Sequence, residues 1–203
     1  MQEALQRQKM LVNVGCGPAP LLTRTPLFLD WHQLRVDIDK AARPDIVADI
    51  TDLSPLGDGM ADAVWASHCL EHLYQHQVAG ALAEFYRILA DDSFAVILVP
   101  DIQALADLIG TDRIHEVIYE SPAGPVSAHD MVYGFGPAVA AGQTGMAHRC
   151  GFTPTILVNL LDETRFAEYA IRRLPTLELV VVARKTSELG ESDCESLLQA
   201  LAL

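Results

Sequence analysis

Apolar and polar positions alternate in blocks along the first half of the chain, which predicts strands separated by loops and one clear helix. Short apolar runs at residues 10–14, 34–38, 46–48 and 63–66, and a longer one at 94–99, have the length of buried strands. Before the longest run, Val78, Ala81, Leu82, Phe85 and Ile88 recur at helical spacing and predict a helix over 75–90. Alternating strands and helices of this kind predict an α/β fold with a parallel sheet.

The second half is less regular. Residues 102–109 predict a short helix, and glycines and prolines predict an irregular region that continues to about residue 146. Thr153 followed by Pro154 predicts a cap and first position of a helix reaching about residue 162. Segments 165–172 and 176–183 predict two closing strands, and the tail 186–203, acidic and then leucine-rich, predicts a surface helix. The sequence does not decide whether this helix packs against its own chain or against a second copy in a homo-oligomer.

The loop after the first strand carries the first candidate chemistry. Gly15-Cys16-Gly17 follows an apolar strand, and Asp37 ends the next strand twenty residues after Gly17. Glycines let the backbone approach a ligand closely, and a carboxylate can accept hydrogen bonds from both hydroxyls of a ribose. The glycine loop and Asp37 together predict a pocket for an adenosine-containing cofactor.

Two prolines discriminate between such cofactors. A dinucleotide site requires a third glycine and free amides that cradle a pyrophosphate, but Pro20 stands at the third position and Pro18 lacks an N–H. This favours a nucleoside cofactor without phosphate, S-adenosylmethionine, over NAD, which leaves a nicotinamide dehydrogenase as the weaker alternative.

Further motifs follow in a recognisable order: residues 46–50, residues 62–73 with Leu70-Glu71-His72-Leu73, residues 84–90, and residues 94–101. Over residues 10–101 the chain resembles the class I S-adenosylmethionine-dependent methyltransferases of type 11. The resemblance implies a doubly wound, Rossmann-like, mostly parallel seven-stranded sheet with an antiparallel C-terminal hairpin. It also implies one domain over 1–203, with a cofactor-binding half at 10–101 and an acceptor-site insertion at 102–150. Pro18, Pro20 and Pro26 predict that the first helix is short or missing.

The resemblance also assigns roles to residues. Asp37 is expected to hold the ribose, Asp49 to accept from the adenine amino group with Ile50 beside the ring, and Asp52 is an alternative to Asp49. Asn13 departs from the family, which more often has an acidic residue there. The expected cofactor-binding residues are Asn13, Gly15, Cys16, Gly17, Asp37, Ile38, Asp49, Ile50, Ser67 and His68.

Methyl transfer from a sulfonium is an in-line displacement, in which positioning does much of the work. A hydroxyl acceptor often needs a general base, whereas an amine need only be neutral. The acceptor is expected beyond the fourth and fifth strands, around residues 129–134 and 146–149. The candidate catalytic residues there are His68, Asp101, His129, Tyr133 and His148.

Two other interpretations stay open. His68-x-x-Glu71-His72 matches a zinc hydrolase pattern, but that chemistry needs a helix already running through the first histidine, whereas a strand is expected to end there. No metal is therefore expected. The second interpretation is a non-catalytic binding or partner subunit that keeps the fold, and the short segment before the first strand makes it credible.

Composition and charge indicate which classes of binding partner and which cellular location to expect. The formal net charge is -13, with 14 basic and 27 acidic residues, so nucleic acid is disfavoured and a small-molecule acceptor is expected. The sequence has no apolar run of membrane-spanning length and a polar start, so no membrane association is expected. The four cysteines are scattered, which favours free thiols and a cytoplasmic location.

Overall fold

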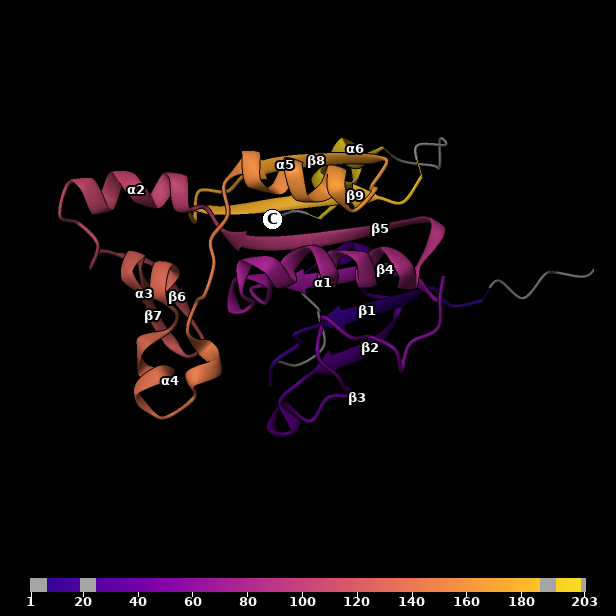
Figure 1. The fold of residues 1–203 in the computed structure, drawn as a ribbon, viewed down its shortest axis with the longest axis horizontal. Coiled ribbons are helices and arrows are strands. Elements are labelled where there is room, and N and C mark those ends of the chain that lie inside the picture. Colours follow the sequence, from indigo (N-terminus) through magenta and orange to yellow (C-terminus); the bar gives the residue numbers. More distant parts are fainter. Residues whose placement is uncertain (1–6, 19–24, 187–192, 202–203) are drawn as a thin grey trace, which may run out of the picture.

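One seven-stranded sheet forms the centre of the structure, a computed structural model that describes residues 7–18, 25–186 and 193–201. The strand order is β3-β2-β1-β4-β5-β9-β8 (Figure 1). The strands are β1 (Met10–Val14), β2 (His32–Asp37), β3 (Ile46–Val47), β4 (Ala61–Ser67), β5 (Leu89–Pro100), β8 (Glu168–Arg173) and β9 (Glu178–Arg184).

Strand directions follow the expected plan. The first five strands of the chain pair in parallel, and β9 pairs antiparallel with both β5 and β8. The carboxyl ends of β1, β2, β3, β4 and β5 therefore lie at one edge, where open α/β sheets bind their ligands. The predicted Rossmann-like sheet with a closing antiparallel hairpin is confirmed.

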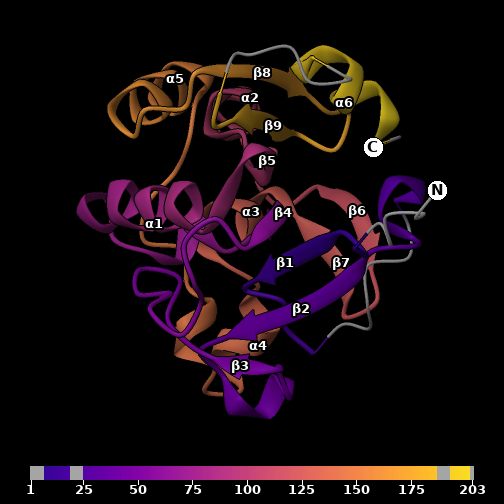
Figure 2. The same cartoon turned by 90° about the vertical axis from the view of Figure 1, so that its right-hand side faces the viewer.

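Helices cover the two faces of the sheet unequally (Figure 2). On one face, α1 (Gln75–Ile88) and α5 (Pro154–Glu163) bury Val78, Phe85 and Leu157 against the strands. On the other, α6 (Cys194–Ala200) buries Leu197 and Leu198 over β8 and β9. The predicted tail helix is thus present over part of its range and packs against its own chain.

The first helix is reduced, as the prolines predict. Between β1 and β2 the described residues form only η1 (Pro26–Phe28), a three-residue 3-10 turn, and residues 19–24 lie outside the described part. Aromatic rings cover the sheet here: the Phe28 ring lies 5.1 Å from that of Trp31 and 6.0 Å from that of Trp65. These edge-to-face contacts bury area that a helix would otherwise cover.

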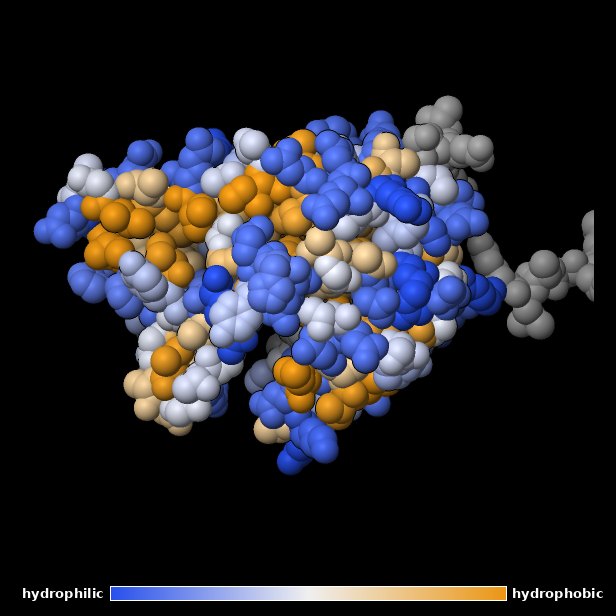
Figure 3. All heavy atoms as spheres, in the orientation of Figure 1, coloured by the Kyte–Doolittle hydropathy of each residue, from blue (hydrophilic) through white to orange (hydrophobic). Residues whose placement is uncertain are grey.

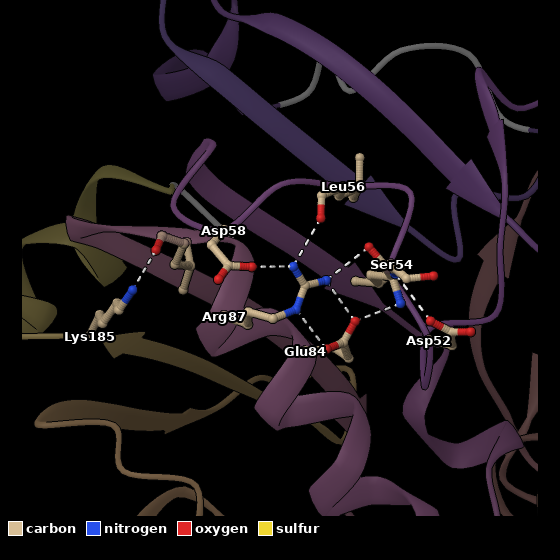
Figure 4. Close-up of polar contacts among 9 residues, drawn as sticks. Asp52, Ser54, Leu56, Asp58, Glu84, Arg87 and Lys185 are labelled. Atoms are coloured by element: carbon tan, nitrogen blue, oxygen red, sulfur yellow. Dashed lines mark hydrogen bonds and ion pairs between the residues drawn. The ribbon is translucent and has the colours of Figure 1, made fainter.

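The connection from β3 to β4 also lacks a helix and is fastened by one side chain of α1 (Figure 4). The Arg87 guanidinium donates to the carbonyls of Leu53 and Leu56, both at 2.9 Å, and to the Asp58 carboxylate at 2.7 Å. It also forms a two-point hydrogen-bonded pair with Glu84, whose carboxylate accepts from the Leu53 amide at 2.7 Å. Charge-assisted bonds of this geometry are the strong ones.

This network predicts sensitivity to acid. The hydrogen bond from Arg87 lowers the pKa of Glu84, so its stabilisation is complete above the unfolded pKa of about 4.3 and is lost as the pH falls through the lower folded value. We expect Glu84→Gln to lower the melting temperature at pH 7. Below about pH 4 the melting temperature of the variant should approach that of the wild type. Melting curves between pH 3 and 7 check this, and a difference that persists unchanged to pH 3 would contradict it.

The insertion is more regular than the sequence indicates. α2 (Ile102–Gly110) is confirmed, but the region expected to be irregular contains the hairpin of β6 (Val117–Ser121) and β7 (Gly124–Ser127), α3 (Ala128–Tyr133), α4 (Gly136–Ala140) and the 3-10 turn η4 (Thr144–Met146). Ser127 caps α3 by accepting from the Asp130 amide, and Asp130 accepts from the Ser127 amide in return. This Ser-x-x-Asp capping box was a readable signal that the glycines and prolines around it obscured.

The remaining helix predictions are confirmed with small changes. α1 ends at Ile88, because Leu89 already pairs with Ala61 in the sheet. α5 begins at Pro154, with the Thr153 hydroxyl accepting from the Ile156 amide. Among the described residues, no helix is long and apolar enough to cross a membrane.

Candidate cofactor and acceptor site

The glycine loop lies at the carboxyl end of β1 and depends on its glycines. Gly15 and Gly17 have φ values of 61° and 56°, in the left-handed region. A Cβ on Gly15 would lie 2.5 Å from the Cβ of Cys69, whereas one on Gly17 would point into open space. Gly15 therefore permits close packing of two loops, and Gly17 leaves room for a ligand. Cys16 is buried between them, and burial raises the pKa of its thiol.

A pair of glycine substitutions separates these effects. Gly15→Ala is expected to destabilise the protein by roughly 2–4 kcal/mol, because it combines overpacking with an unfavourable φ. Gly80→Ala, in the middle of α1 with nothing near its Cβ, is expected to stabilise it by about 0.5–1 kcal/mol. Urea unfolding of both variants checks this, and a neutral Gly15→Ala would show that the loop is misplaced.

Asp37 joins the end of β2 to the glycine loop. Its Oδ2 accepts from the Gly17 amide at 2.7 Å, and its Oδ1 accepts from the Asp39 amide at 2.8 Å. These bonds orient a carboxylate that is 9% exposed, and each oxygen keeps further lone pairs for ligand hydroxyls. Ile38 beside it is 66% exposed, so it offers an apolar surface at the same edge.

The three candidate residues after β3 differ in burial and in hydrogen bonding. Asp49 is half-buried and accepts from the amide and hydroxyl of Thr51 at 2.9 and 2.8 Å, which forms a side-chain turn. Ile50 is buried in the main core rather than exposed at the edge. Asp52 accepts from the Ser54 amide, and its pKa is lowered by hydrogen bonding with the side chain of Ser54 first and with this amide second.

Two further expected cofactor residues lie on neighbouring strands. Asn13 is on β1, in register with Arg35 of β2 and Trp65 of β4, and is almost fully buried. Ser67 is the last residue of β4. Both stand near the same edge as Gly15 and Asp37, so these four residues lie along one line of strand ends.

His68 follows β4 and is held between two carboxylates. Its Nε2 lies 2.6 Å from Glu178 of β9, and its Nδ1 lies 3.2 Å from Glu71. Burial opposes a charge on this ring, but the hydrogen bonds to Glu178 and Glu71 outweigh it and raise the pKa of His68 to about 10. An imidazolium has no lone pair with which to accept a proton. These two ion pairs do not favour His68 as a general base, and the role that they support is to position the loop.

Asp101 is likewise held by structural contacts. One of its oxygens accepts from the amides of Gln103 and Ala104 and so caps α2, and the other lies 2.8 Å from Nε of Arg173. The side chain is completely buried. A carboxylate held by a helix cap and an ion pair is favoured in a structural role over a catalytic one.

The three remaining candidates divide into two groups. The rings of His129 and Tyr133, on α3, lie 4.9 Å apart, and Tyr133 is 58% exposed. His148 lies instead against His72, with ring centroids 4.9 Å apart. Burial lowers the pKa of His148, so this ring is neutral at pH 7.

The zinc hydrolase arrangement is not formed. His68 has a φ of 52° and precedes the 3-10 turn η3 (Leu70–His72), so no helix passes through it and its ring is turned to the two carboxylates.

Sequence reasoning missed Glu178, which no local motif marks. It also missed Tyr119 of β6, whose pKa is raised to about 12 by burial and by the charges of Glu178 and Glu71.

The insertion stands over the carboxyl ends of the strands. In Figure 1, α2, α3 and α4 lie beyond the arrowheads of β5, β4 and β1. Figure 3 shows this side of the molecule hollowed between the lobe that carries α4 and the part that carries β2 and β3. The predicted acceptor region thus borders the edge on which the cofactor residues are gathered.

The comparisons with known proteins agree with this geometry. Residues 12–97 match the model of a methyltransferase domain family. No curated protein sequence shows significant similarity to this chain.

Solved structures share the fold at low sequence identity. A methyltransferase from Archaeoglobus fulgidus, described as SAM-dependent, is 16% identical with a TM-score of 0.58, over 87% of this chain and 86% of that one. The PH0226 protein of Pyrococcus horikoshii is 14% identical with a TM-score of 0.59, over 89% and 84%. A 1,6-didemethyltoxoflavin N1-methyltransferase of Burkholderia thailandensis, solved with bound 1,6-didemethyltoxoflavin and S-adenosylhomocysteine, is 18% identical with a TM-score of 0.55, over 89% of this chain and 72% of that one. Residues 12–97 therefore match a methyltransferase domain family, and the chain shares its fold with solved S-adenosylmethionine-dependent methyltransferases.

Proposed function

We propose that this protein is a methyltransferase that transfers the methyl group of S-adenosylmethionine to a small-molecule acceptor held between the insertion and the strand ends. The observation that carries the proposal is the insertion itself, which lies beyond the strand ends (Figure 1) and has few basic side chains. Between residues 102 and 150 the basic side chains are Arg113 and Arg149. Arg113 is paired with Glu116 at 2.6 Å, and Arg149 lies over the ring of Tyr74. A nucleic acid would find little there to neutralise its phosphates.

The residues at the edge fit this cofactor. Gly17 leaves open space where a side chain would project, and Asp37 presents an oriented carboxylate with free lone pairs. Asp37 would hold the ribose hydroxyls, and Asp49 and Ser67 would face the rest of the nucleoside. The bound cofactor supplies an electrophilic methyl group on a sulfonium.

The chain's own contribution is mainly positioning. His68 and Asp101 are committed to ion pairs, so neither is available to take a proton. His129, Tyr133 and His148 remain as candidate bases, and an amine acceptor in its neutral form needs none of them. We expect most of the rate enhancement to come from orienting the acceptor in line with the methyl group, which is worth about 7–11 kcal/mol in well-oriented reactions.

A turnover assay tests the proposal. Purified protein and S-adenosylmethionine are mixed with separate panels of small-molecule amines, phenols and carboxylic acids, and with tRNA, DNA and protein, and S-adenosylhomocysteine release is measured. Turnover with a small molecule is the expected result. Turnover only with a nucleic acid would overturn the acceptor class, and cofactor binding without turnover on any panel would favour the non-catalytic partner subunit.

We also propose a cytoplasmic location. The cysteines Cys16, Cys69, Cys150 and Cys194 are all free thiols, which is the state expected in a reducing compartment. Fluorescence microscopy of a tagged full-length protein checks this, and a membrane-bound or extracellular signal would contradict it.

A further inference from the structure

Three potential metal ligands from separate parts of the chain meet at one point. Glu71 and His72 belong to η3, and His148 comes from the end of the insertion. One ligand atom of each lies within 4.8 Å of the others. This group shares Glu71 and His72 with the sequence pattern noted above, but it replaces His68 by His148, a histidine from a distant part of the chain.

Glu71 presents an oxygen that lacks a partner. The side chain is 1% exposed, and its Oε1 lies 3.2 Å from His68. Its Oε2 is buried and has no hydrogen-bond partner among the described residues. Leaving a buried carboxylate oxygen without a donor is costly, and a cation would satisfy it.

Both histidines are oriented by backbone carbonyls. Nδ1 of His72 lies 3.3 Å from the carbonyl of Ala147, and Nδ1 of His148 lies 2.9 Å from that of Met131. A carbonyl only accepts, so each Nδ1 carries a proton, which leaves Nε2 as the nitrogen of each ring that can bind a metal. Metal-binding histidines are typically oriented in this way, with the second ring nitrogen donating to a carbonyl or carboxylate.

The backbone already holds the two segments together. The Arg149 amide donates to the carbonyl of Glu71 at 2.8 Å, and the His148 amide donates to that of Tyr133 at 3.1 Å. Ligands about 2.1 Å from a tetrahedral ion lie about 3.4 Å apart, so the cluster has to close slightly. Rotation of two half-exposed rings is enough for this movement.

We propose that Glu71, His72 and His148 bind one divalent transition-metal ion of the Zn²⁺ type. Two imidazoles and one carboxylate favour such ions over Mg²⁺, which prefers oxygen ligands alone. Three protein ligands leave at least one coordination position open to water or to another ligand. The ion would join the last residues of the insertion to the loop after β4.

Titration calorimetry on tag-free, metal-stripped protein tests the proposal, first with Zn²⁺ and then with Mg²⁺. We expect one tightly bound Zn²⁺ per chain and a rise in melting temperature of roughly 5 °C at saturating Zn²⁺. No response is expected with Mg²⁺. Failure of the wild type to bind Zn²⁺, or preference for Mg²⁺, overturns the proposal.

Variants then locate the site. His72→Ala and His148→Ala are each expected to weaken Zn²⁺ binding more than about 100-fold, since even outer partners of a metal site are worth 10- to 100-fold. The matched control is His76→Ala, an exposed histidine on α1, which should bind Zn²⁺ like the wild type. Unchanged binding in the first two variants overturns the assignment. S-adenosylhomocysteine binding is measured on the same samples as a separate test of the cofactor site. If the protein does not bind S-adenosylhomocysteine, the result for Zn²⁺ binding still stands.

Discussion

Asp37→Ala is expected to weaken binding of S-adenosylhomocysteine at least about 100-fold while the protein stays folded. In the proposed site the carboxylate would accept from two ribose hydroxyls, and a hydrogen bond to a charged group is worth about 1.5–3 kcal/mol. Loss of two such bonds corresponds to about 2.7 kcal/mol or more, which is at least a hundredfold in the dissociation constant. Isothermal titration calorimetry measures this directly.

The control for Asp37 is its neighbour. Asp39 is exposed, and its side chain accepts from the Ala41 amide at 2.8 Å, outside the glycine loop. Asp39→Ala should therefore leave the dissociation constant within about twofold. Circular dichroism confirms folding, which matters because Asp37 also binds the Gly17 amide. Full affinity in Asp37→Ala would show that the ribose lies elsewhere.

His68→Ala is expected to lower the free energy of unfolding by about 2–3 kcal/mol near pH 6. The substitution leaves Glu71 and Glu178, both almost fully buried, without their shared cation. Breaking a fully buried ion pair costs about 3–5 kcal/mol, and His68, at 34% side-chain exposure, is partly solvated and falls below that range. Urea unfolding with a chelator present measures the difference without any contribution from metal.

The pH dependence of this difference is specific to a charged histidine. The pKa of His68 is raised to about 10 in the folded protein, against about 6.5 when unfolded. Its stabilisation is therefore complete below about pH 6.5 and is lost as the pH rises towards 10. The gap between wild type and His68→Ala should narrow over that interval. His76→Ala should cost less than about 0.5 kcal/mol at every pH. A gap that stays constant with pH would mean that His68 is neutral.

The sequence predicts the sheet well because its signals are local. Buried strands appear as apolar runs, and Thr153 and Pro154 mark the start of α5 with their own chemistry. The proline content of the first loop correctly indicates a reduced first helix in the described part of the chain. Gly15, Gly17 and Asp37 form a cofactor signature for the same reason, since each lies where one strand ends.

The functional surroundings could not be predicted in this way, because they depend on contacts between distant segments. Glu178 reaches His68 only because β9 inserts antiparallel beside β5. That contact changes a candidate base into a cation. His148 lies close to Glu71 and His72 only because the end of the insertion pairs with η3 in the folded protein. No residue spacing in the sequence predicts this contact.

The central claim is that the strand-end edge binds S-adenosylmethionine, and a thermal-shift comparison on the wild-type protein tests it most directly. S-adenosylmethionine, S-adenosylhomocysteine and NAD are each added to separate samples. A ligand at 100 times its dissociation constant adds about 2.7 kcal/mol of stability. We predict a clear rise in melting temperature with both adenosyl compounds and none with NAD. A rise with NAD alone, or no rise with S-adenosylhomocysteine, would contradict the account.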